Sequence, residues 1–197
     1  KEAGLDPNKP PANWAELAER YNKRDYPLCV GIGSLIGRTR NWMGFERVAM
    51  MVYEDPQLME DITEHLCNLV CETLQPVLRD VEFDFGAGWE DICYNHGPIV
   101  GYDFMRNVVT PRYKRITELL ARHGCHVAWT DCDGNLLPIL DCFMDGGINC
   151  MFPVEVHAGT DPIEIRRRYP SALMQGGVCK MKLARGKKEI REELERL

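Results

Sequence analysis

Residues 125–135 read CHVAWTDCDGN, and this stretch decides the fold. Its apolar part, residues 125–130, predicts a buried strand, and its polar part, residues 131–135, predicts a loop at the carboxyl end of that strand. Upstream, Thr110-Pro111 predicts the start of a helix that runs to His123 and stops at Gly124. The stretch is typical of a unit in which a helix leads into a strand and the strand ends in polar residues.

The same alternation extends in both directions along the chain. Apolar runs predict four more strands, and periodic apolar residues with capping residues predict the helices between them. The strands are expected at residues 27–35, 81–85, 148–152 and 173–176, and further helices at residues 14–21, 41–53, 55–77, 136–145, 161–169 and 186–197.

Alternating strands and helices predict an α/β fold with parallel strands and right-handed crossovers. The strands are continuously apolar, which predicts that both faces of the sheet are covered. About five such units fit either an open doubly wound sheet or part of a closed (β/α)8 barrel of the TIM type. Because a full barrel needs about 250 residues, a barrel would be incomplete in this chain of 197 residues.

We expect a single domain over residues 1–197, with a connector and a short helix over residues 1–26. Because the sequence opens on Lys1, we also expect the chain to be a fragment or a processed chain. A net charge of −6 argues against nucleic-acid binding. No apolar run is long enough for a membrane helix, and no signal peptide opens the chain. Nine cysteines without a CxxC pair predict reduced thiols in the cytoplasm.

Acidic side chains follow the predicted strands at their carboxyl ends, where ligands bind in both architectures. Glu90 and Asp91 follow one strand, and Asp131 and Asp133 follow the next. Carboxylates that face one pocket repel each other, so that one of them holds a proton near neutral pH and acts as a general acid or base. Asp131 and Asp133 could also bind a metal such as zinc together with Glu155.

Each of these residues also has a purely structural interpretation. Residues 133–135 are common in turns, and Glu90 and Asp91 could simply accept backbone N–H bonds. Arg38 and Arg40 flank the exit of the first strand, where they would bind a substrate carboxylate or phosphate or remain solvated. The Gly31-x-Gly33 pattern is too short for a dinucleotide-binding fingerprint.

Four segments share their order and spacing with a known family. They are Trp89-Glu90-Asp91 with Tyr94, Gly97-Pro98, Phe104 and Pro111-Arg112-Tyr113; His123-Gly124 with Asp131-Cys132-Asp133-Gly134-Asn135 and Pro138; Gly146-Gly147 with Phe152-Pro153-Val154-Glu155 and Ala158-Gly159; and Tyr169-Pro170 with Gly176-Gly177 and Gly186. Over residues 28–197 the chain resembles the uroporphyrinogen decarboxylase superfamily, which also contains corrinoid-dependent methyltransferases. The resemblance implies a (β/α)8 barrel of which this chain lacks the first strands and the last.

The decarboxylases of this superfamily use no cofactor. They hold the carboxylates of a tetrapyrrole with arginines and stabilise the protonated pyrrole with an aspartate, and the resemblance places those residues before this chain begins. The family's tyrosine falls near Trp42, its serine near Ile92, and a late histidine beyond Leu197.

The methyltransferases bind zinc through a His-x-Cys-Gly-Asn motif and a later cysteine. Asp131 stands where the histidine would be and Asp133 where the first cysteine would be, so oxygen ligands replace the softer ones.

We therefore expect an enzyme of this superfamily whose reaction is methyl transfer linked to a corrinoid. The alternatives are uroporphyrinogen decarboxylation and a non-catalytic barrel that binds a corrinoid or another tetrapyrrole. The expected partners are a small-molecule or tetrapyrrole substrate, a corrinoid protein, and a second copy or the missing barrel segments, without nucleic acid or membrane. Catalysis is assigned to Glu90, Asp91, Asp131 and Asp133, substrate binding to Trp89, Asn135, Arg38 and Arg40, and metal binding to Asp131, Asp133 and Glu155.

Overall fold

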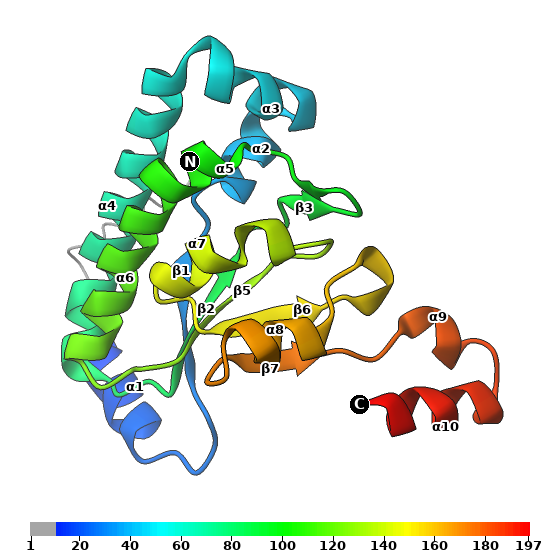
Figure 1. The fold of residues 1–197 in the computed structure, drawn as a ribbon. Coiled ribbons are helices and arrows are strands. Elements are labelled where there is room, and N and C mark those ends of the chain that lie inside the picture. The colour runs from blue at the N-terminus through cyan, green and yellow to red at the C-terminus, as the bar shows by residue number, and fades with distance from the viewer. Residues whose placement is uncertain (1–10) are drawn as a thin grey trace.

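A parallel five-stranded sheet forms the centre of the computed structural model, which describes residues 11–197 (Figure 1). The fold is therefore α/β, as predicted, while the connector predicted at the start of the chain lies almost entirely outside the described residues. The strands are neighbours in the order β1 (Cys29–Gly33), β2 (Phe85–Trp89), β5 (Ala128–Asp131), β6 (Cys150–Val154) and β7 (Leu173–Gly176).

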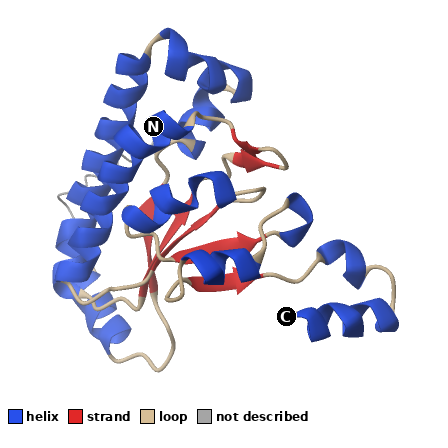
Figure 2. Cartoon of the chain, in the orientation of Figure 1, coloured by secondary structure: helices blue, strands red, loops and turns tan. Residues whose placement is uncertain are grey.

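Helices connect each strand to the next (Figure 2). The sheet neighbours follow chain order without the reversal that defines a doubly wound sheet. Helices α4 (Pro56–Asp80), α6 (Thr110–Arg122), α7 (Leu140–Asp145) and α8 (Pro162–Arg168) make these connections, and α4 and α6 lie side by side (Figure 1).

Shorter elements surround this frame. They are α1 (Trp14–Asn22), α2 (Gly37–Met43), α3 (Phe45–Glu54), a hairpin of β3 (Cys93–Tyr94) and β4 (Gly97–Pro98), α5 (Tyr102–Phe104), a π-helical turn (Met105–Val109), 3-10 turns at Leu137–Ile139 and Val156–Ala158, α9 (Lys180–Leu183) and α10 (Lys187–Arg196). The last two extend away from the sheet beyond β7 (Figure 1).

Only one face of the sheet is packed against helices. In β1, Val30 and Ile32 are buried, whereas Cys29 and Gly31 are exposed. In β2 and β5, buried residues likewise alternate with partly exposed ones. The prediction that both faces are covered is therefore wrong for the described residues, because the crossover helices pack on one side and leave the other side open.

The open face carries a row of aromatic side chains. The ring centroids of Phe85 and Trp129 are 6.4 Å apart, and those of Trp129 and Phe152 are 4.8 Å apart. Gly31 and Ala87 are in register with Trp129 on the same face. Small residues on β1 and β2 therefore stand next to large ones on β5 and β6, and they leave a hollow above the first two strands.

Several predicted boundaries shift in the structure. Strand β2 begins at Phe85 instead of residue 81, because the backbone N–H of Val81 still bonds to the carbonyl of Val77 in α4. The helix predicted at residues 41–53 is two helices, α2 and α3, separated by Gly44 with a φ of +87°. The helix predicted from Thr110 is preceded by a π-helical turn next to Pro111, whose missing N–H disfavours a regular turn there.

Two predicted caps are confirmed. Asp55 accepts a hydrogen bond from the N–H of Leu58 at 3.1 Å, and Asp161 accepts one from the N–H of Ile163 at 2.9 Å. In both helices a proline follows the capping residue. All nine cysteines are free thiols. From residue 11 onward, no helix combines the length and apolar character needed to cross a bilayer.

Candidate functional site

The carboxyl ends of β2, β5 and β6 lie next to one another and position the predicted site. Trp89 is in register with Asp131, and Asp131 is in register with Phe152. The carbonyl oxygen of Asp131 accepts hydrogen bonds from the N–H groups of both Glu90 and Asp91, at 2.8 and 3.0 Å. This shared acceptor fixes the ends of β2 and β5 relative to each other.

Four carboxylates interact electrostatically at this edge, and we call Asp91, Asp131, Asp133 and Glu155 the acidic cluster. Partial burial raises the pKa of Asp131, and the nearby charges of Asp133 and Asp91 raise it further. Partial burial also raises the pKa of Asp133, together with the charges of Glu155 and Asp91. Asp131 and Asp133 therefore favour their protonated forms more than an isolated aspartate does.

Glu155 differs from these two aspartates because it is paired. It accepts hydrogen bonds from the ammonium group of Lys180 and, at 2.8 Å, from the N–H of Gly134. The hydrogen bond from Lys180 is the main cause that lowers the pKa of Glu155. Glu155 therefore stays ionised, and it holds the loop after β5 in place.

Glu90 lies behind the cluster and is fully buried. Its carboxylate accepts hydrogen bonds from the N–H groups of Leu35, Ile36 and Gly37, at 2.6, 2.9 and 2.6 Å, and from the hydroxyl of Tyr113. Burial raises its pKa, and these hydrogen bonds act in the opposite direction. This geometry matches the structural interpretation of Glu90, because the residue anchors the turn after β1 and has no surface in a cavity.

Arg40 joins two of the predicted site residues. Its guanidinium lies 5.2 Å from the ring centroid of Trp89 and 3.1 Å from the carboxylate of Asp91. It also donates to the carbonyl oxygen of Asp91, which has a φ of +49°. Arg40 is thus engaged in holding Trp89 and Asp91, and it orients the cluster instead of facing a cavity.

Two cavities flank the cluster. The larger, of about 690 Å³, lies between α4 and the strands β1, β2 and β5, and its lining includes Arg38, Trp89, Trp129 and Asp131. The smaller, of about 300 Å³, lies between the ends of β6 and β7, and its lining includes Asp133, Glu155 and Lys180. Asp131 therefore borders the larger cavity and Asp133 the smaller one, and Arg38 is the predicted binding arginine that borders the larger one.

The loop after β5 is rigidly held. Gly134 has a φ of +92°, and a Cβ atom there would lie 2.4 Å from the backbone of Cys93. The buried hydroxyl of Thr160 donates to the carbonyl of Gly134 at 2.8 Å. Asn135, predicted to bind substrate, instead accepts a hydrogen bond from the N–H of Leu137 at 3.2 Å, which is ordinary turn chemistry.

The predicted metal ligands do not form a metal-holding group. Among residues 11–197, no set of three or more histidine, cysteine, aspartate or glutamate side chains is close enough to bind an ion. Cys132, between Asp131 and Asp133, points the other way and is buried. The donor set around Asp131, Asp133 and Glu155 therefore does not fit zinc, and we derive no step through a metal.

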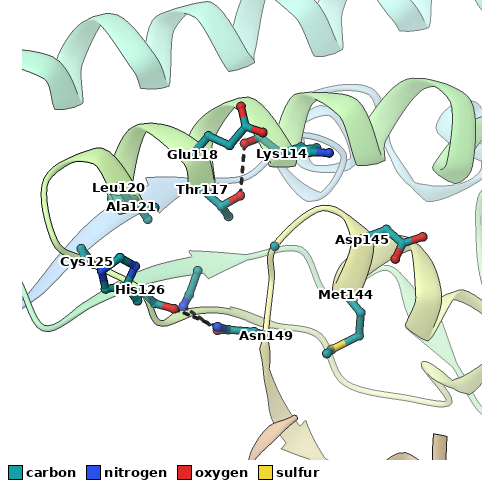
Figure 3. A pocket seen from close by; sticks show the side chains of 12 residues that line it. Lys114, Thr117, Glu118, Leu120, Ala121, Cys125, His126, Met144, Asp145 and Asn149 are labelled. Carbon is teal, nitrogen blue, oxygen red and sulfur yellow. Dashed lines mark hydrogen bonds between the residues drawn. The ribbon is translucent and has the colours of Figure 1, made fainter. Parts of the chain in front are cut away.

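A separate cavity of about 260 Å³ lies at the opposite end of the sheet, between α6 and α7 (Figure 3). Two of its polar side chains are occupied by the fold. Thr117 donates to the carbonyl of Gly146 at 2.9 Å, and Asn149 donates to the carbonyl of His126 at 2.8 Å. None of the predicted site residues lines this cavity, so it is a weaker candidate than the acidic cluster.

Sequence reasoning did not single out Lys180, Trp129 or Tyr113 as individual site residues. Tyr113 belongs to a segment that carries the family resemblance but has no role assigned there, and Trp129 reads as part of an apolar strand. Lys180 lies 25 residues from its partner Glu155, and no local pattern links them. Only the distribution of charges after successive strands pointed to this edge.

Comparison of the chain with known protein families, with curated proteins and with solved structures found no match.

Proposed function

We propose that this chain is part of a (β/α)8 barrel enzyme similar to the uroporphyrinogen decarboxylase superfamily, with general acid–base chemistry at the carboxyl ends of its strands. Two features support the barrel. The strands are neighbours in chain order, and helices cover only one face of the sheet. Further strands, or a second copy of the chain, would cover the open aromatic face. Light scattering tests this point, because a monodisperse monomer would contradict association through that face.

The observation that carries the proposed function is the position of Asp131 and Asp133, each beside other carboxylates and each bordering a cavity, because partial burial and those charges raise the pKa of both. A carboxylic acid that keeps its proton closer to neutral pH is a suitable proton donor. The larger cavity falls within the size range of small-molecule sites, about 300–1,000 Å³, and Trp89 and Trp129 give it flat apolar walls.

Methyl transfer linked to a corrinoid is the reaction that we place first. A corrinoid, when bound, accepts a methyl group. Asp131 donates its proton to the substrate oxygen that loses the methyl group, which makes that oxygen a better leaving group. The carboxylate left on Asp131 is repelled by Asp133 and Asp91, so it takes up a proton from water before the next turnover.

Tetrapyrrole decarboxylation is the second candidate, and Arg38 favours it. The cationic side chain of Arg38 borders the larger cavity beside Asp131, where it would pair with a substrate carboxylate. In that reaction Asp131 protonates the carbon that loses carbon dioxide. A barrel that binds a corrinoid without turnover is the third candidate. For all three we propose a cytoplasmic location, because all nine cysteines are free thiols.

The test incubates the chain separately with a methoxylated aromatic compound plus a reduced free corrinoid, and with uroporphyrinogen. Methylated corrinoid in the first mixture would support methyl transfer, and coproporphyrinogen in the second would support decarboxylation. In either case the rate should fall in Asp131→Asn. Asp145→Asn is the matched control, because Asp145 lies at the opposite end of the sheet and lines the other cavity.

Tight corrinoid binding without product in either mixture would identify a binding protein and reject the enzyme. Turnover that is equal in wild type, Asp131→Asn and Asp133→Asn would reject acid–base chemistry at the cluster.

A further inference from the structure

The polar groups around the larger cavity limit what it can bind. Among the described residues that line it, Arg38 is the only cation and Asp131 the only carboxylate. The two hydroxyl groups of the lining already donate within the protein, that of Ser34 to the buried carboxylate of Glu90 at 3.3 Å and that of Thr73 to a carbonyl of its own helix. Apart from indole N–H groups, the cavity therefore offers a ligand one positive charge and one acid.

The guanidinium of Arg38 is available to a ligand. The residue is exposed, and within residues 11–197 it forms no ion pair. The nearby Arg40, by contrast, is engaged with Asp91 and Trp89. A guanidinium pairs with a carboxylate through two parallel hydrogen bonds, so Arg38 indicates a ligand with one carboxylate. A ligand with several carboxylates would leave the others without a cation in the cavity.

The walls of the cavity are apolar, and its two tryptophan rings are held in place. The ring of Trp129 has neighbours at centroid distances of 6.4 Å, to Phe85, and 4.8 Å, to Phe152. The ring of Trp89 is fixed by the guanidinium of Arg40, which lies 5.2 Å from its centroid. Helix α4 adds four aliphatic side chains to the lining. Because aromatic rings pack favourably in stacked or edge-to-face pairs, these walls indicate a ligand with a flat ring.

Gly31 keeps the space between these walls open. It lies in the middle of β1, where a glycine weakens the strand and often marks the close approach of a ligand. Its φ lies outside the left-handed region, and a Cβ atom placed on it would meet no other atom within 4 Å. Since neither the backbone nor a described neighbour requires a glycine at this position, a ligand in the cavity explains it.

We propose that the larger cavity binds a planar aromatic monocarboxylate, whose ring packs against Trp89 and Trp129 and whose carboxylate pairs with Arg38. Asp131 then contacts another substituent of the ring. The inference rests on the proposed function in taking this cavity as the substrate site, and it narrows the substrate to a small aromatic acid instead of a tetrapyrrole with several carboxylates. A volume of about 690 Å³ suits such a molecule.

The experiment measures binding to the chain by isothermal titration calorimetry with three probes that share one ring system. They are 2-naphthoate, the neutral 2-naphthamide and the dianion 2,6-naphthalenedicarboxylate. Naphthoate should bind about tenfold more tightly than naphthamide, the usual worth of a hydrogen-bonded charge pair. The dianion should bind more weakly than naphthoate, because its second carboxylate finds no cation in the cavity and is repelled by Asp131.

Two variants test the two parts of the site. Arg38→Gln should bring the affinities for naphthoate and naphthamide close to each other, and Arg47→Gln is its control, because Arg47 is an exposed arginine that does not line the cavity. Gly31→Leu should fill the cavity and weaken both probes about tenfold or more, without a lower melting temperature. Cys29→Leu is its control, since Cys29 lies on the same face of β1, is exposed and does not line the cavity.

Three results would overturn the proposal. They are no saturable binding of naphthoate up to about 1 mM, equal affinities for naphthoate and naphthamide in the wild type, or a preference for naphthoate that is unchanged in Arg38→Gln. Because the preference is a ratio of two affinities on the same protein, a folding defect would not imitate its loss.

Failure of the proposed function would give a different result. If naphthoate binds as expected but turnover is absent, or is equal in wild type and Asp131→Asn, acid–base chemistry is rejected and the ligand class stands. If turnover depends on Asp131 but naphthoate binds no better than naphthamide, only the ligand class is rejected.

Discussion

Glu90 directly follows β2 and Asp131 is the last residue of the neighbouring strand β5, yet their surroundings are opposite. Glu90 is fully buried and receives three backbone N–H bonds and a tyrosine hydroxyl. Asp131 is partly exposed, borders a cavity and has like charges as neighbours. A carboxylate surrounded by hydrogen-bond donors stabilises the fold, whereas one beside other carboxylates and a cavity has its pKa raised and stays accessible to a ligand.

The comparison predicts its largest effect for Glu90→Leu. The substitution leaves three buried N–H groups and the Tyr113 hydroxyl without an acceptor, so it should lower the free energy of unfolding by about 3–5 kcal/mol. That corresponds to a fall in melting temperature of roughly 6–20 °C for a domain of this size. Thermal unfolding followed by circular dichroism measures it. Tyr113→Phe, which removes one donor, should cost less, about 1.5–3 kcal/mol. A melting temperature unchanged in Glu90→Leu would refute the anchoring role.

Asp131→Asn should show the opposite pattern. It should lower the turnover of whichever reaction is established by about 10²–10⁴-fold, the usual contribution of a general acid, while leaving the melting temperature equal or higher. The physical reason is that the amide cannot supply the proton and is not repelled by Asp133 and Asp91. Parallel measurement of turnover and melting temperature checks both parts. A variant that loses stability and keeps its turnover would reverse the assignment of the two acids.

The pH dependence of stability sharpens the contrast within the acidic cluster. Asp131 has a raised pKa in the folded state. At pH values between its ordinary pKa and this raised pKa, the native protein therefore binds more protons than the unfolded chain does. The contribution of Asp131 to the free energy of unfolding therefore falls as pH rises through that window. Urea unfolding at several pH values measures this. The free energy of unfolding of Asp131→Asn should rise relative to that of wild type as pH increases through the window, and the difference should stay constant at higher pH.

Glu155 supplies the internal contrast for that titration. Its pKa is lowered by Lys180, so its stabilising contribution is present above the ordinary glutamate pKa and is lost as pH falls through the lowered value. Glu155→Gln should therefore be less stable than wild type at neutral pH, and the deficit should vanish in acid. If the free energies of unfolding of Glu155→Gln and Asp131→Asn, each relative to wild type, changed with pH in the same way, the two residues would not have the different environments described above.

The smallest effect is expected at an acid that only caps a helix. Asp161→Ala removes one hydrogen bond to the N–H of Ile163 and should lower the free energy of unfolding by about 1 kcal/mol. Turnover and its pH profile should be unchanged. A large loss of activity in Asp161→Ala would contradict the distinction between acids that stabilise the fold and acids that transfer protons, because it would show that the burial and hydrogen-bond partners of an acid do not predict which role it has.

The sequence was informative where local chemistry decides the structure. Capping aspartates before prolines located α4 and α8, and apolar runs located four strands of the sheet, whereas the strand predicted at residues 81–85 overlaps β2 only at Phe85. The boundary of β2 was misplaced because residues 81–84 are held by contacts outside the strand. Asp84, for example, accepts a hydrogen bond from the N–H of Leu28 at 2.7 Å. Local patterns do not contain such distant partners.

The sequence predicts where the candidate site lies, but not which of its acids face a cavity and which one is buried in the fold. Acids after successive parallel strands must meet at one edge, so Asp91, Asp131, Asp133 and Glu155 could be grouped. That Glu90 turns inward depends on the close approach of β2 to Gly37, where a Cβ atom would lie 2.1 Å from the Glu90 carbonyl oxygen. The sequence shows the glycine but not the residue that it contacts.

Whether neighbouring carboxylates raise the pKa of Asp131 can be measured by titrating the aspartate carboxyl carbons with carbon-13 NMR, in the wild type and in Asp133→Asn. We expect Asp131 to titrate above the ordinary aspartate pKa of about 3.9, and we expect its pKa to fall in Asp133→Asn because a repelling charge is removed. An Asp131 pKa at or below 3.9 that is the same in both proteins would contradict it.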